Sequence, residues 1–158
     1  MNVAVVGGYR CSKTIYNTAK ELGTLIAQQG WILICGGRTG VMEAACRGAK
    51  AEGGITVGIL PSNSHKEANR YVDIKIPTGL GYARNVLVVR AADVVVAVDG
   101  QYGTLSEIAF ALSENKTVLG IETWDIPGIK NIKTPKRAVD YIKKHFKSKC
   151  LTKRKSKS

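Results

Sequence analysis

Short apolar runs alternate with amphipathic stretches along the chain, and glycine or proline separates most of them. Such alternation is typical of βαβ units and a parallel sheet. The expected strands are Val3–Val6, Trp31–Cys35, Ile55–Leu60, Tyr71–Ile76, Asp93–Val98 and Val118–Ile121. The expected helices are Thr14–Gln29, Val41–Ala51, Tyr82–Ala91, Leu105–Leu112 and Pro135–Phe146. The pattern predicts a single-domain α/β Rossmann-like fold, with a mostly parallel sheet of about six or seven strands and helices on both faces.

The chain has the length of one domain with a substantial hydrophobic core. It has 158 residues, of which 44% are hydrophobic, so a disordered body is excluded. The run Asp93–Val98 is the most continuously apolar, as in a strand buried on both faces. No apolar run approaches the roughly 20 residues of a membrane-spanning helix. Residues 1–146 are therefore expected to form one domain without internal repeats, and no membrane partner is expected.

Positive charge is concentrated at the end of the sequence. The formal net charge is +12, but residues 143–158 hold eight Lys and Arg and no acid, which leaves sixteen basic and twelve acidic residues in 1–142. Residues 147–158 have the composition of a solvated, disordered basic tail. Clustered lysines can bind nucleic acid, but the body has no matching basic stripe interleaved with aromatic residues. A nucleic-acid partner is therefore not favoured.

Cysteine and histidine are too few and too scattered for a metal site. The four cysteines, Cys11, Cys35, Cys46 and Cys150, form no Cys-x-x-Cys pair, and histidine occurs only twice. Scattered free thiols fit a reducing compartment. No basic segment precedes the first apolar run, as a secretory signal requires. We therefore expect a cytoplasmic protein without a metal or a resident cofactor.

Three of the predicted strands end in glycine-rich turns. The glycines and the adjoining threonine are Gly7, Gly8, Gly36, Gly37, Gly40, Gly100, Gly103 and Thr104. In an open parallel sheet, ligands bind beyond the carboxyl ends of the strands, where turns lead into helix N-termini. Free backbone amides and the helix dipole suit phosphate there, and glycine lets an anion approach the backbone. The three turns are therefore expected to meet at one phosphate-binding pocket.

The turn at residues 36–40 is not diagnostic by itself. It supplies the last two glycines of a Gly-x-Gly-x-x-Gly pattern, with Cys35 in place of the first. The next predicted strand ends at Leu60 without the acidic residue of a nicotinamide site, and no Gly-Lys-Ser/Thr sequence follows, so a P-loop ATPase is excluded. The alternative to phosphate contact is a turn that only packs a helix closely against the sheet.

Three residues near the last turn are candidates for chemistry. Thr104 can hold a phosphate oxygen or cap the following helix, and Glu107 three residues later can close a capping box with it. Arg84 follows a flexible stretch, residues 78–81, and has no acid partner at helical spacing. An isolated arginine is more often a surface residue. The functional and the structural interpretations of these residues both stay open at this point.

These residues together resemble the Lonely-Guy family, whose members are often labelled lysine decarboxylases in error. The resemblance covers roughly residues 1–125. It rests on Gly36-Gly37-x-x-Gly40-Val41-Met42, on Arg84, and on Gly100-x-x-Gly103-Thr104-x-x-Glu107. The segments 36–44, 78–85 and 103–107 look closer still to the branch that contains the molybdenum-cofactor carrier proteins.

The resemblance implies a reaction and two catalytic residues. Lonely-Guy enzymes hydrolyse the N-glycosidic bond of nucleoside 5′-monophosphates and release the base and ribose 5-phosphate. By this likeness Glu107 holds the ribose hydroxyls and stabilises the positive charge that develops on the sugar. Arg84 positions phosphate and sugar through its rigid fork of donors.

The turns and the resemblance together assign the residues that bind the ligand. They are Gly7, Gly8, Gly36, Gly37, Gly40, Met42, Asn85, Gly100, Gly103 and Thr104. By the likeness, the last three cradle the 5′-phosphate and Met42 lines the base or phosphate pocket. The family also implies a homodimer or higher homo-oligomer. Residues 86–89 are apolar around much of the predicted helix, which is a modest physical reason to expect the same here.

Three departures from the family pattern leave two functions open. Asp99 stands in place of a proline, Gln101 in place of a glycine, and Asn85 in place of a lysine. Asp99 adds a negative charge, Gln101 narrows the phosphate-binding turn, and Asn85 removes a positive charge. These changes weaken the case for turnover more than the case for binding. The chain is interpreted as a nucleotide-binding protein that hydrolyses nucleoside 5′-monophosphates. The alternative is a non-catalytic carrier of a phosphorylated ligand such as the molybdenum cofactor.

Overall fold

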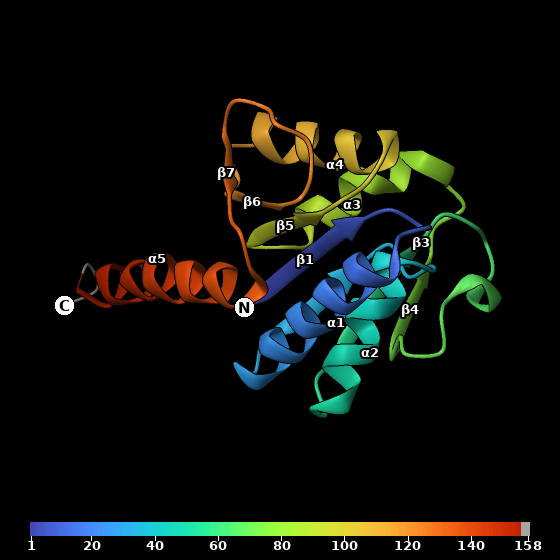
Figure 1. The fold of residues 1–158 in the computed structure, drawn as a ribbon, viewed down its shortest axis with the longest axis horizontal. Helices are drawn as coiled ribbons and strands as arrows, with labels where there is room; N and C mark the ends of the chain where they lie inside the picture. The colour runs from blue at the N-terminus through green and yellow to red at the C-terminus, as the bar shows by residue number, and fades with distance from the viewer. Residues whose placement is uncertain (156–158) are drawn as a thin grey trace.

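Seven parallel strands form the centre of the computed structural model, which describes the backbone of residues 1–155 and the side chains of residues 1–146. Their order across the sheet is β4-β3-β2-β1-β5-β6-β7, and each pair of neighbours is parallel (Figure 1). The strands are β1 Asn2–Gly7, β2 Ile32–Cys35, β3 Thr56–Leu60, β4 Ile74–Pro77, β5 Val94–Val98, β6 Val118–Ile121 and β7 Ile129–Asn131. This confirms the predicted single-domain α/β fold of Rossmann-like type.

Helices cover both faces of the sheet. They are α1 Lys13–Gln28, α2 Val41–Ala51, α3 Asn85–Arg90, α4 Tyr102–Ser113 and α5 Pro135–Lys155, with short 3-10 turns η1 His65–Glu67 and η2 Gly81–Arg84. Helices α1 and α2 lie on one side of the sheet, and α3 and α4 lie on the other (Figure 1). The beginning of α5 joins the core of the α1 and α2 side. The core therefore consists of two apolar layers that the sheet separates.

Strands β1 and β5 are buried on both faces because each lies between the two helical layers. Along β1, Val3 and Val5 belong to the layer of α1 and α2, whereas Ala4 and Val6 belong to the layer of α3 and α4. All four side chains are at most 1% exposed. Every residue of β5 is also buried. Burial on both faces explains why these two strands are continuously apolar in sequence.

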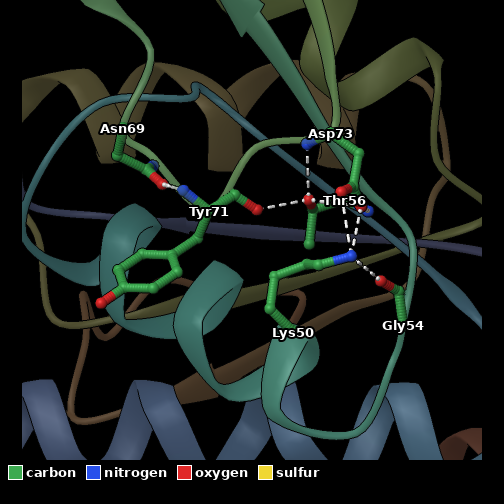
Figure 2. Close-up of polar contacts among 6 residues, drawn as sticks. All are labelled: Lys50, Gly54, Thr56, Asn69, Tyr71 and Asp73. Carbon is green, nitrogen blue, oxygen red and sulfur yellow. Dashed lines mark hydrogen bonds and ion pairs between the residues drawn. The ribbon is translucent and has the colours of Figure 1, made fainter.

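Strand β4 was predicted at Tyr71–Ile76 but begins at Ile74, because a polar cluster holds the preceding residues (Figure 2). The buried hydroxyl of Thr56 donates to the carbonyl of Tyr71 (2.6 Å), and Asp73 accepts hydrogen bonds from the amide of Thr56 and from Nζ of Lys50 (both 3.0 Å). These bonds hold residues 71–73 in a bend, so the strand begins after it. Burial acts to raise the pKa of Asp73, but the hydrogen bonds from Lys50 and Thr56 outweigh it and hold the pKa below its ordinary value.

Two further elements differ from the prediction. Strand β7 was not expected, because its three residues show no periodicity and only Ile129 is half-buried at this edge of the sheet. The predicted helix Tyr82–Ala91 begins as the 3-10 turn Gly81–Arg84 and becomes an α-helix at Asn85. The segment is therefore two short pieces, and Arg84 lies at the joint between them.

Helix α5 continues to Lys155, past its predicted end at Phe146. The predicted disordered tail, residues 147–158, lies outside the described side chains, and its last three residues lie outside the described backbone. The tail therefore stays a prediction. Within the described residues, no helix combines the length and the apolar character that crossing a bilayer demands.

Self-association also stays a prediction, and helices α3 and α4 offer a surface on which to test it. Val88 and Val89 are buried within the chain, but Val86 and Leu87 are only half-buried and Phe110 is 39% exposed. We expect light scattering at micromolar concentration to give at least twice the chain mass of 17.0 kDa, and Phe110→Asp to lower the mass toward one chain. A single-chain mass for the native protein would contradict this expectation.

Candidate functional site

The order of strands opens a crevice between β1 and β5. From β1 the chain moves through β2 and β3 to the edge strand β4, and from β5 it moves the other way to β7. Helix α1 follows β1 and helix α4 follows β5, and they lie on opposite faces of the sheet (Figure 1). The turns that follow these neighbouring strands therefore diverge. Open α/β sheets bind their ligands at such a point.

A cavity of about 480 Å³ lies in this region. Its wall is formed by Gly7, Gly8, Tyr9, Arg10, Arg38, Met42, Tyr82, Arg84, Asn85, Gln101, Tyr102, Gly103, Thr104, Ser106 and Glu107. The wall thus combines residues from the turns after β1, β2 and β5 with the segment that leads into α3. The volume is in the range of small-molecule sites. Eight of the twelve predicted site residues line the cavity: Gly7, Gly8, Met42, Arg84, Asn85, Gly103, Thr104 and Glu107.

The other four predicted residues, Gly36, Gly37, Gly40 and Gly100, lie behind the wall. A Cβ atom at Gly37 would fall against the side chain of Leu60, and φ of Gly37 is +74°. The glycines of this turn therefore pack closely against the sheet, and Arg38 is the residue of the turn that lines the cavity. These glycines shape the cavity from behind and do not face it.

The turns after β1 and β2 are joined into one rigid unit. The amide of Val41 donates to the carbonyl of Gly8 (3.0 Å), and the hydroxyl of Thr39 donates to the carbonyl of Tyr9 (2.8 Å). Gly40 has φ of +67°, and a Cβ atom there would collide with the backbone of Gly8 and Tyr9. Only glycine permits this close backbone approach. Side chains carried by either turn therefore have fixed attachment points.

Arg84 is buried in the wall of the cavity, contrary to the usual surface position of an isolated arginine. It is 7% exposed, and its Nε has no hydrogen-bond partner within the described residues. Its Nη1 lies 3.7 Å from Oε1 of Glu107, which is too long for a hydrogen bond. A Cβ atom at Gly36 would overlap the guanidinium, so the guanidinium fills the space that this glycine leaves. Burial lowers the pKa of Arg84, and the charge of Glu107 acts in the opposite direction.

Glu107 faces Arg84 from helix α4 and is 6% exposed. Burial raises the pKa of this carboxyl group to about 8, although the charge of Arg84 lowers it in part. At neutral pH the carboxyl group is therefore mostly protonated. The two groups face one another without forming a closed, fully charged ion pair.

Helix α4 begins at Tyr102, earlier than predicted, and no side chain caps it. The N-cap residue is Gln101, whose side chain makes no capping hydrogen bond. Thr104 consequently lies inside the first turn, so the capping box with Glu107 that the sequence allowed does not form. The amides of Tyr102, Gly103 and Thr104 have no partners within the helix. Such a first turn offers several N–H donors to an anion.

Two residues before α4 shape the turn without facing the cavity. Asp99 and Gly100 have positive φ values of +50° and +110°. A Cβ atom at Gly100 would overlap the side chain of Thr104. The carbonyl of Asp99 accepts a hydrogen bond from the hydroxyl of Thr123 (2.6 Å). The extra negative charge expected from Asp99 is therefore outside the cavity wall, whereas Gln101 lies in the wall and narrows it.

Asn85 connects α3 to the first turn of α4. Its Nδ2 donates to Oγ of Ser106 (2.9 Å) and to the carbonyl of Gly103 (3.4 Å), and the Ser106 hydroxyl donates to the same carbonyl (2.7 Å). Asn85 is only 4% exposed. Its amide nitrogen is thus used within the chain, and its role is to hold the first turn of α4 in place.

Sequence reasoning missed five cavity residues with large side chains. They are Tyr9, Arg10, Arg38, Tyr82 and Tyr102. Each lies within two positions of a turn glycine, and that position was the signal by which they could have been found. Tyr82 and Tyr102 are 79% and 81% exposed. They therefore place two aromatic rings at the mouth of the cavity.

Two buried thiols lie behind the site. Sγ of Cys35 and Sγ of Cys46 are 3.5 Å apart and buried, and the amide of Gly37 donates to Cys35 (3.2 Å). In the part of the chain that the structure describes, no group of three or more His, Cys, Asp or Glu residues is placed to hold a metal ion. The cysteine pair supports the turn after β2.

Known proteins are similar to this chain along most of its length. Residues 1–150 match the family model described as the SLOG cluster4 family. The structure is similar to the molybdenum cofactor binding protein from Rippkaea orientalis (39% identity, TM-score 0.83), with coverage of 90% of this chain and 94% of that one. It is equally similar to the molybdenum cofactor carrier protein from Chlamydomonas reinhardtii (36% identity, TM-score 0.83), with coverage of 90% and 96%.

A more distant relative is an enzyme. The chain is 30% identical over 115 residues to a cytokinin riboside 5′-monophosphate phosphoribohydrolase of Mycobacterium tuberculosis. That alignment covers 67% of this chain and 62% of the enzyme. Both groups that the sequence motifs resemble are therefore found among its relatives.

We expect Glu107→Gln to remove a destabilisation that grows with pH. In the unfolded chain a glutamate titrates near about 4.3, whereas the pKa of Glu107 in the fold is about 8. Between these values the unfolded state loses the proton and the folded state keeps it, so native stability falls as pH rises, by an amount on the order of a few kcal/mol. Thermal unfolding measured from pH 5 to pH 8 should show that the native chain loses more stability with rising pH than the variant does.

Glu21→Gln is the matched control, because Glu21 is exposed on α1. Its stability should follow that of the native chain across the same pH range. Identical pH profiles for the native chain and Glu107→Gln would contradict a buried, protonated carboxyl group at this position.

Proposed function

The chain belongs to the SLOG cluster4 family, and from this premise we propose that it binds a small phosphorylated heterocycle and acts as a carrier of the molybdenum cofactor. The observation that carries the proposal is Arg84, a buried guanidinium in the cavity wall whose Nε is unbonded within the described residues. A buried cation with free donors costs free energy unless an anion completes its hydrogen bonds. The uncapped first turn of α4 offers backbone amides at the same cavity.

The cavity wall suggests how such a ligand is held. The amides of Gly103 and Thr104 and the guanidinium of Arg84 provide donors for a phosphate group, which a helix N-terminus and a rigid arginine both suit. The exposed rings of Tyr82 and Tyr102 provide apolar surface for a planar heterocycle at the mouth. A phosphate and a ring are the two parts that a mononucleotide and a phosphorylated pterin share.

Three observations favour binding without turnover. Glu107 is mostly protonated at neutral pH, so it lacks the negative charge that would stabilise a positively charged sugar. Gln101 lines the cavity in the position where the Lonely-Guy pattern has a glycine. The two molybdenum-cofactor proteins are also more similar to this chain than the phosphoribohydrolase is. Binding without chemistry is therefore the better supported function.

The second candidate is hydrolysis of the N-glycosidic bond of nucleoside 5′-monophosphates. Its support is the placement of Arg84 and Glu107 in one cavity wall, 3.7 Å apart, as the resemblance to the hydrolases implies. In its ionised form Glu107 would oppose the positive charge that develops on the ribose as the bond breaks. This candidate requires that the ligand or a higher pH remove the proton from Glu107.

We expect Arg84→Ala to weaken the binding of nucleoside 5′-monophosphates by about tenfold to a hundredfold, because charge-assisted hydrogen bonds to phosphate are lost. Isothermal titration calorimetry measures the change. Arg90→Ala is the matched control, since Arg90 is an exposed arginine paired with Glu114 (2.7 Å) and does not line the cavity. Equal losses in both variants, or no loss in Arg84→Ala, would remove the support for this site.

Base release separates the two candidate functions. For a carrier, we expect nucleoside 5′-monophosphates to bind without release of base, measured by chromatography from pH 6 to pH 9. For a hydrolase, release would increase as pH approaches the Glu107 pKa of about 8, and Glu107→Gln would lower it about a hundredfold while binding persists. Release with this pH profile and this sensitivity would overturn the carrier proposal.

A further inference from the structure

The cavity wall contains two arginines besides Arg84. Arg10 follows the turn after β1, Arg38 belongs to the turn after β2, and both line the cavity. Neither takes part in an ion pair with any residue that the structure describes. This part of the cavity wall therefore holds two positive charges that no ion pair among the described residues neutralises.

The ring of Tyr9 contacts the guanidinium groups of both arginines. Cζ of Arg10 lies 5.4 Å from the centre of the Tyr9 ring, and Cζ of Arg38 lies 5.9 Å from the same centre. Each contact is within the range of a cation–π interaction. Both guanidinium groups are therefore held beside the same ring, in the part of the wall that the turns after β1 and β2 form.

The backbone prevents the two arginines from separating by movement of their turns. The hydrogen bond from Thr39 to the carbonyl of Tyr9 connects the two turns directly, and the close approach of Gly40 to Gly8 leaves no room for a shift. The attachment points of the two arginine side chains are therefore fixed relative to one another. An anion that binds between the two guanidinium groups is attracted by both charges.

The charges of the whole wall point the same way. Three arginines, Arg10, Arg38 and Arg84, face one acid, Glu107, and that acid is mostly protonated at neutral pH. Burial is the main cause that lowers the pKa of Arg84, and the charge of Arg38 lowers it further. A phosphate that binds to Arg84 and the first turn of α4 lies at the turn after β5. The positive charges on the turns after β1 and β2 then still lack an anionic partner.

We propose that Arg10, Arg38 and Tyr9 form a second anion subsite, so that the physiological ligand carries two separate anionic groups. One group binds at α4 and Arg84, and the other binds between the two arginines on the turns after β1 and β2. The ligand class is a mononucleotide-sized heterocycle with an anion at each end, and not a simple monophosphate. This inference rests on the proposed function, since it assigns a second contact to the same ligand.

The test compares ligands that differ in their second anion. Calorimetry at constant ionic strength measures adenosine 5′-monophosphate, adenosine 5′-diphosphate and adenosine 3′,5′-bisphosphate. We expect adenosine 3′,5′-bisphosphate, whose two phosphates are separate, to bind the native chain about tenfold or more tightly than the monophosphate. Adenosine 5′-diphosphate, whose phosphates are contiguous, is the comparison for added charge alone. In the double variant Arg10→Gln/Arg38→Gln the ratio of the bisphosphate affinity to the monophosphate affinity should fall to about one, whatever the variant's affinity for the monophosphate. In Arg84→Ala all three affinities should fall while the preference remains.

Arg70→Gln is the matched control. Cζ of Arg70 lies 4.9 Å from the centre of the Tyr71 ring, so it repeats the stacked pair, but it does not line the cavity. The Arg70→Gln variant should prefer the doubly anionic ligand over the monophosphate to the same extent as the native chain. If the double variant loses the monophosphate as well, the single variant Arg10→Gln, at an exposed position, provides the comparison.

The outcomes distinguish the inference from the proposal on which it rests. Binding of the monophosphate without any gain from a second anion overturns the second subsite and leaves the proposed function intact. A gain that persists in the arginine variants also overturns it. No binding of any phosphorylated heterocycle by the native chain overturns the proposed function, and the subsite with it.

Discussion

Burying the Arg84 guanidinium costs free energy, because a cation taken from water needs hydrogen bonds or an opposite charge in return. The chain provides these only in part. Glu107 is 3.7 Å away and mostly protonated, and Nε of Arg84 is unbonded within the described residues. The surrounding structure is nevertheless built around this group, since Gly36 leaves the space that it fills. The fold therefore holds a site that an anion completes.

Topology explains why this charge lies where a ligand can reach it. Strands β1 and β5 are neighbours, but the chain leaves them for opposite faces of the sheet, so no helix fills the space beyond their ends. Gly7 lets the end of β1 lie close to the end of β5 and to the start of α2, because a Cβ atom there would collide with the carbonyl of Val98 and with Val41. The uncapped start of α4 faces the same space, held by Asn85. The space that the strand order leaves open is thus the one that the candidate ligand-binding groups face.

The sequence by itself determined the type and order of most elements. A strand that is buried on both faces, such as β5, is a continuous apolar run, and an amphipathic helix repeats with its own period. These signals are local, so they need no knowledge of neighbours. The glycine turns were found in the same way, and the parallel sheet then placed them at one edge. Arg84 and Glu107 were assigned through the likeness of their motifs to a known family, because spacing alone allowed a surface arginine and a helix cap.

Only the tertiary structure decided which groups are neighbours. The bend before β4 depends on Thr56 and Asp73, which are separated in sequence, and β7 exists only because β6 offers an edge to pair with. The capping box failed because α4 starts earlier than its apolar residues indicate. The contact of Arg10 and Arg38 with one tyrosine ring joins two turns that are about thirty residues apart in the chain. Burial, pKa and charge pairing arise from such long-range packing, and no local period encodes them.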